Sequence, residues 1–178
     1  MHSDEIWVRN GQRVNPGIRH RKRSGKLFHD CLRLCCISPS AVMVQRGVFS
    51  EIGLFDKHLP VCEDYDMWLR IGCRLPVLYV DEPRLVKHGG HPDQLSRRYR
   101  GMDRYRVIAL HKLLCTQTLR VEDRHAAAAA LLHKARIYVD GAIKRGRFRQ
   151  AGEIEELMDR HRGEASSLSR PPAGAEAG

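Results

Sequence analysis

The stretch LPVCEDYDMWLRIGC (residues 59–73) places three carboxylates, Glu63, Asp64 and Asp66, directly before a run of aromatic and aliphatic residues. Acidic residues are common in the first turn of a helix, where they interact favourably with the positive end of the helix dipole. The stretch therefore predicts a helix over residues 64–72, with the carboxylates at its start. Its expected packed face consists of Tyr65, Trp68, Leu69 and Gly72.

Short elements of mixed type are expected on both sides of this helix. Asn10-Gly11 lies between alternating residues and predicts a β-hairpin. Residues 27–36 have helical apolar spacing, residues 37–46 resemble a buried strand, and residues 46–56 suggest a short helix closed by Gly53. Residues 75–90 suggest two short strands separated by Pro83. The expected fold class is α/β, in which short mixed strands are followed by a helical C-terminal region.

The C-terminal part of the chain is expected to be helical. Apolar residues recur at helical spacing over 96–115, and an alanine-rich segment predicts a helix over 122–144 that stops at Gly146. Residues 147–162 suggest one more helix, whereas the Pro-containing tail 163–178 is expected to be disordered. The chain is therefore expected to divide into a mixed α/β part (1–95), a helical region (96–162) and a disordered tail (163–178).

Composition excludes several classes of protein. The 178 residues are 42% hydrophobic and 29% charged, as in globular proteins, and no apolar run approaches the ~20 residues that span a bilayer. The net charge of +10 favours anionic partners, including phosphates or an anionic membrane surface. The six cysteines show no CxxC pair and no zinc-finger spacing, so reduced thiols are expected rather than disulfides or zinc. A cytoplasmic location is expected, and peripheral membrane contact stays open.

Three sequence blocks in this order resemble the family 2 glycosyltransferases: SDEIWVRNG (3–11), CCISPSAVMVQRGVFSEIGLFDKHLPVCEDYDMWLRIG (35–72) and KHGGHPDQLSR (87–97). The resemblance extends over about residues 3–114. It implies a GT-A fold and transfer of a sugar from a nucleotide diphosphate donor to an acceptor hydroxyl, with inversion. It also implies that this chain corresponds to the acceptor-side portion, and that the nucleotide-binding half with its metal-holding DxD element is missing, as in a truncated fragment with little activity alone.

The resemblance assigns the catalytic base to Asp64. An attacking hydroxyl needs a group that accepts its proton, and a carboxylate at the start of a helix suits that role. Glu63 would then contact the acceptor, and Asp66 would pair with Arg70 four residues later. The alternatives are that all three acids only cap the helix, or that Asp64 and Asp66 form a metal-holding DxD.

A second candidate site lies in KHGGHPDQLSRR (87–98), where a leaving diphosphate needs neutralisation. Gly89 and Gly90 permit close approach of the backbone, and His91 corresponds to a histidine that holds metal or pyrophosphate in related enzymes. Ser96 and Arg97 would begin a helix that favours anions. The alternative is an ordinary turn followed by a helix N-cap.

Two further features have open interpretations. Seven Lys or Arg and no acid lie between Arg9 and Lys26; this loop either contacts an anionic ligand or, as we prefer, is a solvated mobile surface. Trp7 could stack on a sugar ring, whereas Trp68 is expected to pack in the core.

The expected partners of the complete enzyme are a nucleotide-sugar donor and a carbohydrate or lipid-linked acceptor. A divalent metal, Mn²⁺ or Mg²⁺, is expected there but not held by this chain alone. The alternatives are a basic nucleic-acid-binding module, which lacks any recognisable motif and is not favoured, and a noncatalytic interaction domain.

Overall fold

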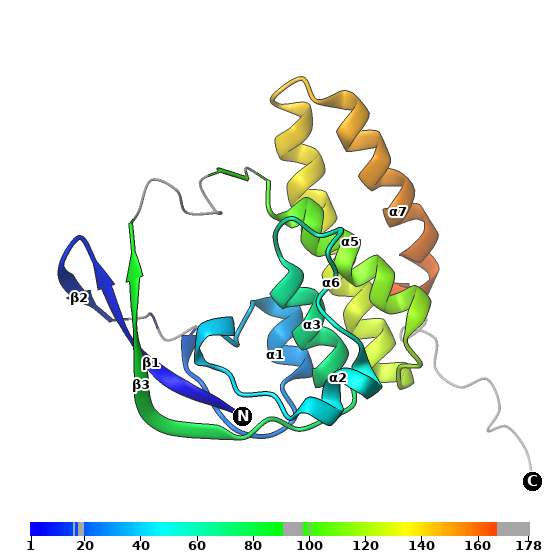
Figure 1. Ribbon diagram of the computed structural model, residues 1–178. Coiled ribbons are helices and arrows are strands. Elements are labelled where there is room, and N and C mark those ends of the chain that lie inside the picture. Colours follow the sequence, from blue (N-terminus) through cyan, green and yellow to red (C-terminus); the bar gives the residue numbers. More distant parts are fainter. Residues whose placement is uncertain (16, 18–19, 91–97, 100, 167–178) are drawn as a thin grey trace, which may run out of the picture.

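The structure is a computed structural model, which describes residues 1–15, 17, 20–90, 98–99 and 101–166. A small sheet lies on one side of the molecule and a group of helices on the other (Figure 1). The N-terminus lies near the junction of these two parts. The protein is therefore mixed α/β, and this order of strands and helices is compatible with part of a nucleotide-sugar transferase-like fold.

The sheet has three strands, β1 (His2–Arg9), β2 (Gln12–Val14) and β3 (Tyr79–Gly89), in the order β2-β1-β3. The predicted hairpin is confirmed: β1 and β2 pair antiparallel, with Arg9 opposite Gln12. Asn10 and Gly11 have φ values of 50° and 78°, the positive φ pair that a tight two-residue hairpin turn requires. β3 pairs with β1 in parallel, which brings residues about eighty positions apart into register, such as Arg9 and Gly89.

Two strand predictions are wrong. Residues 79–89 form one strand through Pro83 rather than two strands, and the register with β1 shifts beside this proline, around Asp4. A β-bulge accommodates a residue that lacks the backbone N–H for a ladder hydrogen bond. Residues 37–46 contain the 3-10 helix η2 (Pro39–Ala41) and a single bridge from Val42 to His2, because Pro39 begins a tight turn where a strand was expected.

The helices follow the sequence pattern more closely. They are α1 (Phe28–Arg33), α2 (Arg46–Ile52), α3 (Glu63–Gly72), α5 (Asp103–Thr116), α6 (Val121–Ile143) and α7 (Phe148–Ser166). Gly53, with φ 88°, ends α2 as predicted, and Gly146, with φ 68°, lies in the turn between α6 and α7. α7 continues to Ser166, past the expected start of the tail at residue 163.

α3 lies at the centre of the molecule, between α1 and α5 (Figure 1). Its residues from Tyr65 to Gly72 are all buried, including the predicted packing residue Trp68. At Gly72 a Cβ would lie 3.3 Å from the Phe28 Cα, so the glycine allows α1 to pack closely against α3. The stretch at residues 59–73 is therefore the core around which the other helices assemble.

α6 and α7 run side by side and continue beyond the rest of the molecule (Figure 1). Small residues of α6, among them Ala127, Ala128 and Ala135, are completely buried. Alanine favours the helix and lets neighbouring helices approach. Among the described residues, no helix has both the length and the apolar character needed to cross a membrane.

Candidate functional site

Asp64 lies in the first turn of α3 and is partly exposed, unlike the buried residues that follow it. Its carboxylate Oδ1 accepts a hydrogen bond from the Tyr65 N–H at 2.7 Å, and Oδ2 accepts one from the Cys35 thiol at 3.3 Å. These two donors fix the carboxylate while leaving further lone pairs available. The geometry suits a group that accepts a proton from a bound hydroxyl.

Cys35 is the donor of this thiol contact. Burial, followed by the negative charge of Asp64, raises the pKa of the Cys35 thiol well above its usual range, so the thiol keeps its proton. The cysteine comes from the segment after α1 and lies 29 residues before Asp64. The sequence indicated only a buried thiol here, because no local pattern relates the two positions.

Two adjoining pockets lie on the Cys35 side of this pair, and Asp64 itself is not among their lining residues. A small pocket of about 110 Å³ is lined by Cys35 together with Trp7 and Lys87. A larger one of about 440 Å³ shares Trp7 and Lys87 and continues to Gly89 and Gly90 at the end of β3. Asp64 is thus one hydrogen bond away from a pocket system that contains three of the predicted ligand-binding residues, Trp7, Gly89 and Gly90.

Trp7 is half-buried and its ring already has neighbours. The indole N–H donates to Glu5 Oε1 at 3.0 Å, and Lys87 Nζ lies 5.2 Å from the ring centroid. The ring of His20 lies 5.1 Å away and is tilted by 57°. These contacts orient the indole at the boundary of the two pockets, where a ligand would have to share the ring with Lys87.

The glycines of the second predicted site differ in their roles. Gly89 pairs with Arg9 at the end of the β1–β3 ladder. Gly90 has a φ of 97°, and a Cβ there would lie 2.8 Å from Asn10 Oδ1, so the residue allows the chain to pass close to the hairpin turn. The other members of that prediction, His91, Ser96 and Arg97, lie outside the described residues.

The basic loop is not simply a solvated surface, which corrects the preferred interpretation. The Lys22 side chain is only 7% exposed; its Nζ donates to the Ser3 carbonyl at 2.8 Å and lies 3.4 Å from Glu5 Oε1. Arg23 pairs with Asp30 at the surface. The loop packs onto β1 because Glu5 is a buried carboxylate that needs a cationic partner.

A buried cation on α6 was not predicted from the sequence. Lys134 is 8% exposed, donates to the Arg33 carbonyl at 3.2 Å and lies 5.9 Å from the Tyr65 ring. Burial, and then the charge of Arg106, lowers the pKa of Lys134. Lys134 lies near Tyr65 in the first turn of α3, but it is 70 residues from Asp64 in sequence and resembles any other lysine of a helix.

The residues around Asp64 do not form a set of oxygen ligands for Mn²⁺ or Mg²⁺. Those ions require several carboxylate, carbonyl or water oxygens, whereas the neighbour of Asp64 Oδ2 is a protonated thiol. Within the part of the chain that the structure describes, one group of three potential metal ligands comes together, His111, Cys115 and His161, on α5 and α7. Glu63, the first residue of α3, is partly exposed beside Asp64.

Comparison with known proteins indicates distant relatives among glycosyltransferases. An uncharacterized glycosyltransferase of Rickettsia felis is 29% identical over 101 residues, which are 54% of this chain and 15% of that protein. Proteins of the same description from Rickettsia conorii and Rickettsia bellii are 38% and 31% identical over 72 residues, or 40% of this chain. The chain thus spans 9–15% of the length of these relatives.

No protein-family model matches the chain, and no solved structure matches it. The similarity to proteins named glycosyltransferases therefore supports a glycosyltransferase relationship without a more specific family.

Proposed function

We propose that this chain forms the acceptor-side portion of an inverting, family 2-like glycosyltransferase, with Asp64 as the catalytic base. The observation that carries the proposal is the position of Asp64, a partly exposed carboxylate held by two donors, one of which, the Cys35 thiol, lines a polar pocket. The similarity to three proteins named glycosyltransferases supports the same class of reaction.

In the proposed reaction an acceptor hydroxyl lies against Asp64. As the oxygen attacks the anomeric carbon of the donor sugar, Asp64 accepts the hydroxyl proton, and the bond to the nucleotide diphosphate breaks. Cys35 acts as a positioning residue, because its thiol holds Oδ2. Glu63 and Trp7 are proposed to contact the acceptor, whereas Lys87 offers positive charge at the pocket.

The proposal also includes the site that binds the nucleotide-sugar donor in the complete enzyme. A nucleotide diphosphate needs cationic groups, backbone N–H groups or a divalent cation to neutralise it. Gly89 and Gly90, which line the larger pocket, would offer backbone to the diphosphate. His91, Ser96 and Arg97, which lie outside the described residues, are proposed to belong to the same donor-binding site. The divalent cation stays a prediction for the complete enzyme, and the described residues offer no oxygen site for it.

Asp64→Asn tests the base directly. Because the chain is proposed to be the acceptor-side portion, transfer is measured on the enzyme with its donor-binding half restored, as release of nucleoside diphosphate from a panel of nucleotide sugars with mono- and oligosaccharide acceptors. Because a general base contributes about 10²- to 10⁴-fold to a rate, the variant is expected to lose at least about 100-fold in turnover. Asp159→Asn, an exposed carboxylate on α7, is the matched control and is expected to keep the parental rate.

Binding can be tested on the chain alone. In NMR titrations, acceptor saccharides are expected to shift the amide signals of Cys35, Asp64 and Lys87 but not that of Asp159. Full turnover in the Asp64→Asn variant would remove Asp64 from the role of base. Salt-sensitive binding of oligonucleotides without any response to saccharides would instead favour the nucleic-acid alternative.

A further inference from the structure

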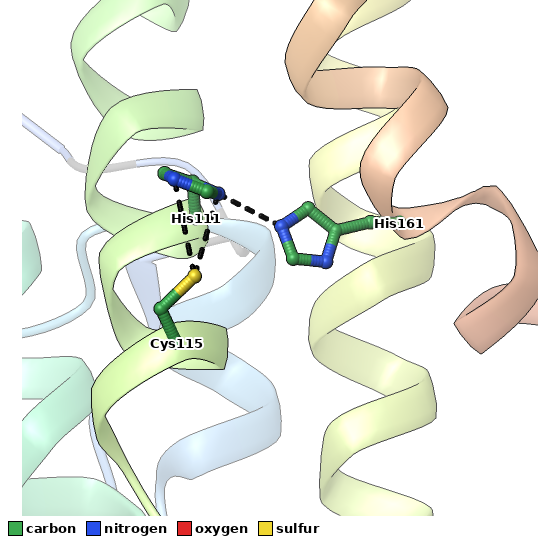
Figure 2. A group of neighbouring side chains, drawn as sticks. All are labelled: His111, Cys115 and His161. Atoms are coloured by element: carbon green, nitrogen blue, oxygen red, sulfur yellow. Dashed lines mark hydrogen bonds between the residues drawn. The ribbon is translucent and has the colours of Figure 1, made fainter.

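Three side chains with metal-binding atoms converge between α5 and α7 (Figure 2), and none of them belongs to the candidate transferase site. His111 and Cys115 lie four residues apart on α5 and therefore on one face of that helix. His161 reaches them from α7, and its Nε2 lies 2.8 Å from His111 Nδ1. The Cys115 Sγ lies 3.7 Å from the same nitrogen.

These distances are close to those of a tetrahedral metal site. Zn²⁺ binds imidazole nitrogen at about 2.0–2.1 Å and thiolate sulfur at about 2.3 Å, so ligand atoms around it are separated by roughly 3.3–3.6 Å. All three ligand atoms here lie within 4.8 Å of one another. Small side-chain rotations would open the space between the two imidazoles for an ion.

The surroundings of His161 also match a metal site. Its side chain is only 5% exposed, and its Nδ1 lies 3.4 Å from Glu164 Oε1. Glu164 in turn pairs with Arg124 of α6, whose Nε lies 3.1 Å from Oε2. A histidine that binds metal through one nitrogen commonly donates its other N–H to a carboxylate, which orients the ring. Here the nitrogen left for the ion is the one that faces His111 and Cys115.

A simple hydrogen bond between two neutral imidazoles is the alternative. Burial, and then the charge of His161, lowers the pKa of His111, which allows one shared N–H between the rings. This explains the contact of 2.8 Å. It does not explain why a thiol on the same face of α5 points at the pair (Figure 2).

We propose that His111, Cys115 and His161 form a binding site for a zinc-type transition metal ion. Two nitrogens and one sulfur favour zinc over the oxygen-preferring Mg²⁺ or Ca²⁺. Cys115 is exposed, so the fourth position is open to water or to a ligand from outside. The bound ion would connect α5 to α7 and thereby stabilise the helical part of the protein.

The sequence pattern predicts reduced thiols without zinc and gives no indication of this proposed site. That prediction rests on spacing along the chain, and His161 is 50 residues from His111. Only the packing of α7 against α5 brings the third ligand to the other two.

Titration of the purified full chain with Co²⁺, as a spectroscopic substitute for zinc, tests the proposal. One equivalent is expected to give a thiolate-to-cobalt absorption band and the visible bands of a tetrahedral ion. Competition by Zn²⁺ then gives its dissociation constant. Cys115→Ser is expected to abolish the thiolate band and to weaken Zn²⁺ binding by more than about 100-fold, since even outer partners of a metal site contribute 10- to 100-fold.

Matched variants keep the test specific. Cys73→Ser and His133→Ala replace a thiol and an exposed imidazole outside the cluster, and both are expected to bind metal as the parent does. Glu164→Gln is expected to weaken Zn²⁺ binding by about 10- to 100-fold. Circular dichroism of each variant shows whether it is folded; because Cys115 is exposed, its serine variant is expected to fold.

Two results would overturn the proposal. One is the absence of stoichiometric Co²⁺ or Zn²⁺ binding to the reduced protein. The other is a thiolate band that persists in Cys115→Ser and disappears in Cys36→Ser, which would place the ion at the cysteines near α1. Neither result depends on transferase activity, so the zinc site and the proposed function fail or stand separately.

Discussion

Asp64 and Asp66 lie two residues apart in α3, yet their surroundings are opposite. Asp64 is partly exposed and contacts the Cys35 thiol. Asp66 is 1% exposed; its Oδ2 lies 2.8 Å from Arg70 Nη2, and its Oδ1 lies 3.0 Å from Lys112 Nζ. The predicted pairing of Asp66 with Arg70 is confirmed. One acid is therefore available for chemistry, whereas the other is part of the core.

The ion pair of Asp66 connects three segments. Arg70 donates to the carbonyls of Ile52 and Leu54 after α2, at 2.7 and 2.9 Å. Lys112 of α5 also pairs with Asp56, at 2.7 Å. Because these buried charges are partnered, the cost of removing them from water is offset.

Asp66→Asn is expected to destabilise the protein by about 3 kcal/mol, since it leaves the buried charge of Arg70 without its counter-ion. Urea unfolding followed by circular dichroism measures the change. The exposed Asp159→Asn is the control and should change stability by no more than about 0.5 kcal/mol. Equal stabilities of the two variants would contradict a structural role for Asp66.

At the scale of elements, the long α6 and α7 depend on the turn between them. Gly146 has a φ of 68° in that turn, a conformation that L side chains rarely adopt. Gly152 lies within α7 at an ordinary helical φ, and a Cβ there would meet nothing within 4 Å. Two glycines six residues apart thus serve different purposes.

Alanine substitutions should change stability in opposite directions at these glycines. Gly146→Ala is expected to destabilise the protein by about 1 kcal/mol, because the left-handed conformation is strained with a Cβ. Gly152→Ala is expected to stabilise it by about 0.5–1 kcal/mol through higher helix propensity. Thermal unfolding of both variants beside the parent checks the signs. Stabilisation by Gly146→Ala would contradict the assigned turn.

The junction between the sheet and the helices depends on buried polar groups. His2 is 2% exposed, and its Nε2 lies 3.2 Å from the Arg23 carbonyl, so the neutral ring donates to the basic loop. Burial lowers the pKa of His2, with a further contribution from Lys22, although the Arg23 carbonyl and Glu5 act in the opposite direction. Burial alone would raise the pKa of Glu5, but the Trp7 hydrogen bond and Lys22 lower it.

These shifts predict a loss of stability at acid pH. Below the unfolded pKa of His2, about 6.5, the unfolded chain binds a proton that the folded chain resists, so stability falls as pH decreases. The lowered pKa of Glu5 adds a second loss below about pH 4.5, where the unfolded carboxyl takes up its proton. His2→Gln, which retains a donor for Arg23, is expected to flatten the decline between pH 6.5 and 5. Midpoints of urea unfolding across this pH range measure the decline. An unchanged dependence of stability on pH in the variant would exclude His2 as its cause.

The sequence by itself determined the elements whose signals lie within a few residues. The Asn10-Gly11 hairpin, the α2 stop at Gly53, the long α6 and the Asp66–Arg70 pair each follow from turn geometry or helical spacing. It failed for residues 37–46, where an apolar run resembles a strand whether or not a partner is present to pair with it. It also failed at Pro83, because the strand continues past the proline through an irregularity in its pairing with β1.

Only the tertiary structure decided which distant side chains meet. The parallel pairing of β1 with β3, the Cys35–Asp64 contact and the approach of His161 to His111 join positions 29 or more residues apart. Such contacts depend on how whole elements pack, and no spacing along one element encodes them. Asp64 could therefore be selected from the sequence as a carboxylate at a helix start, whereas its thiol partner and the metal-ligand cluster required the packed helices.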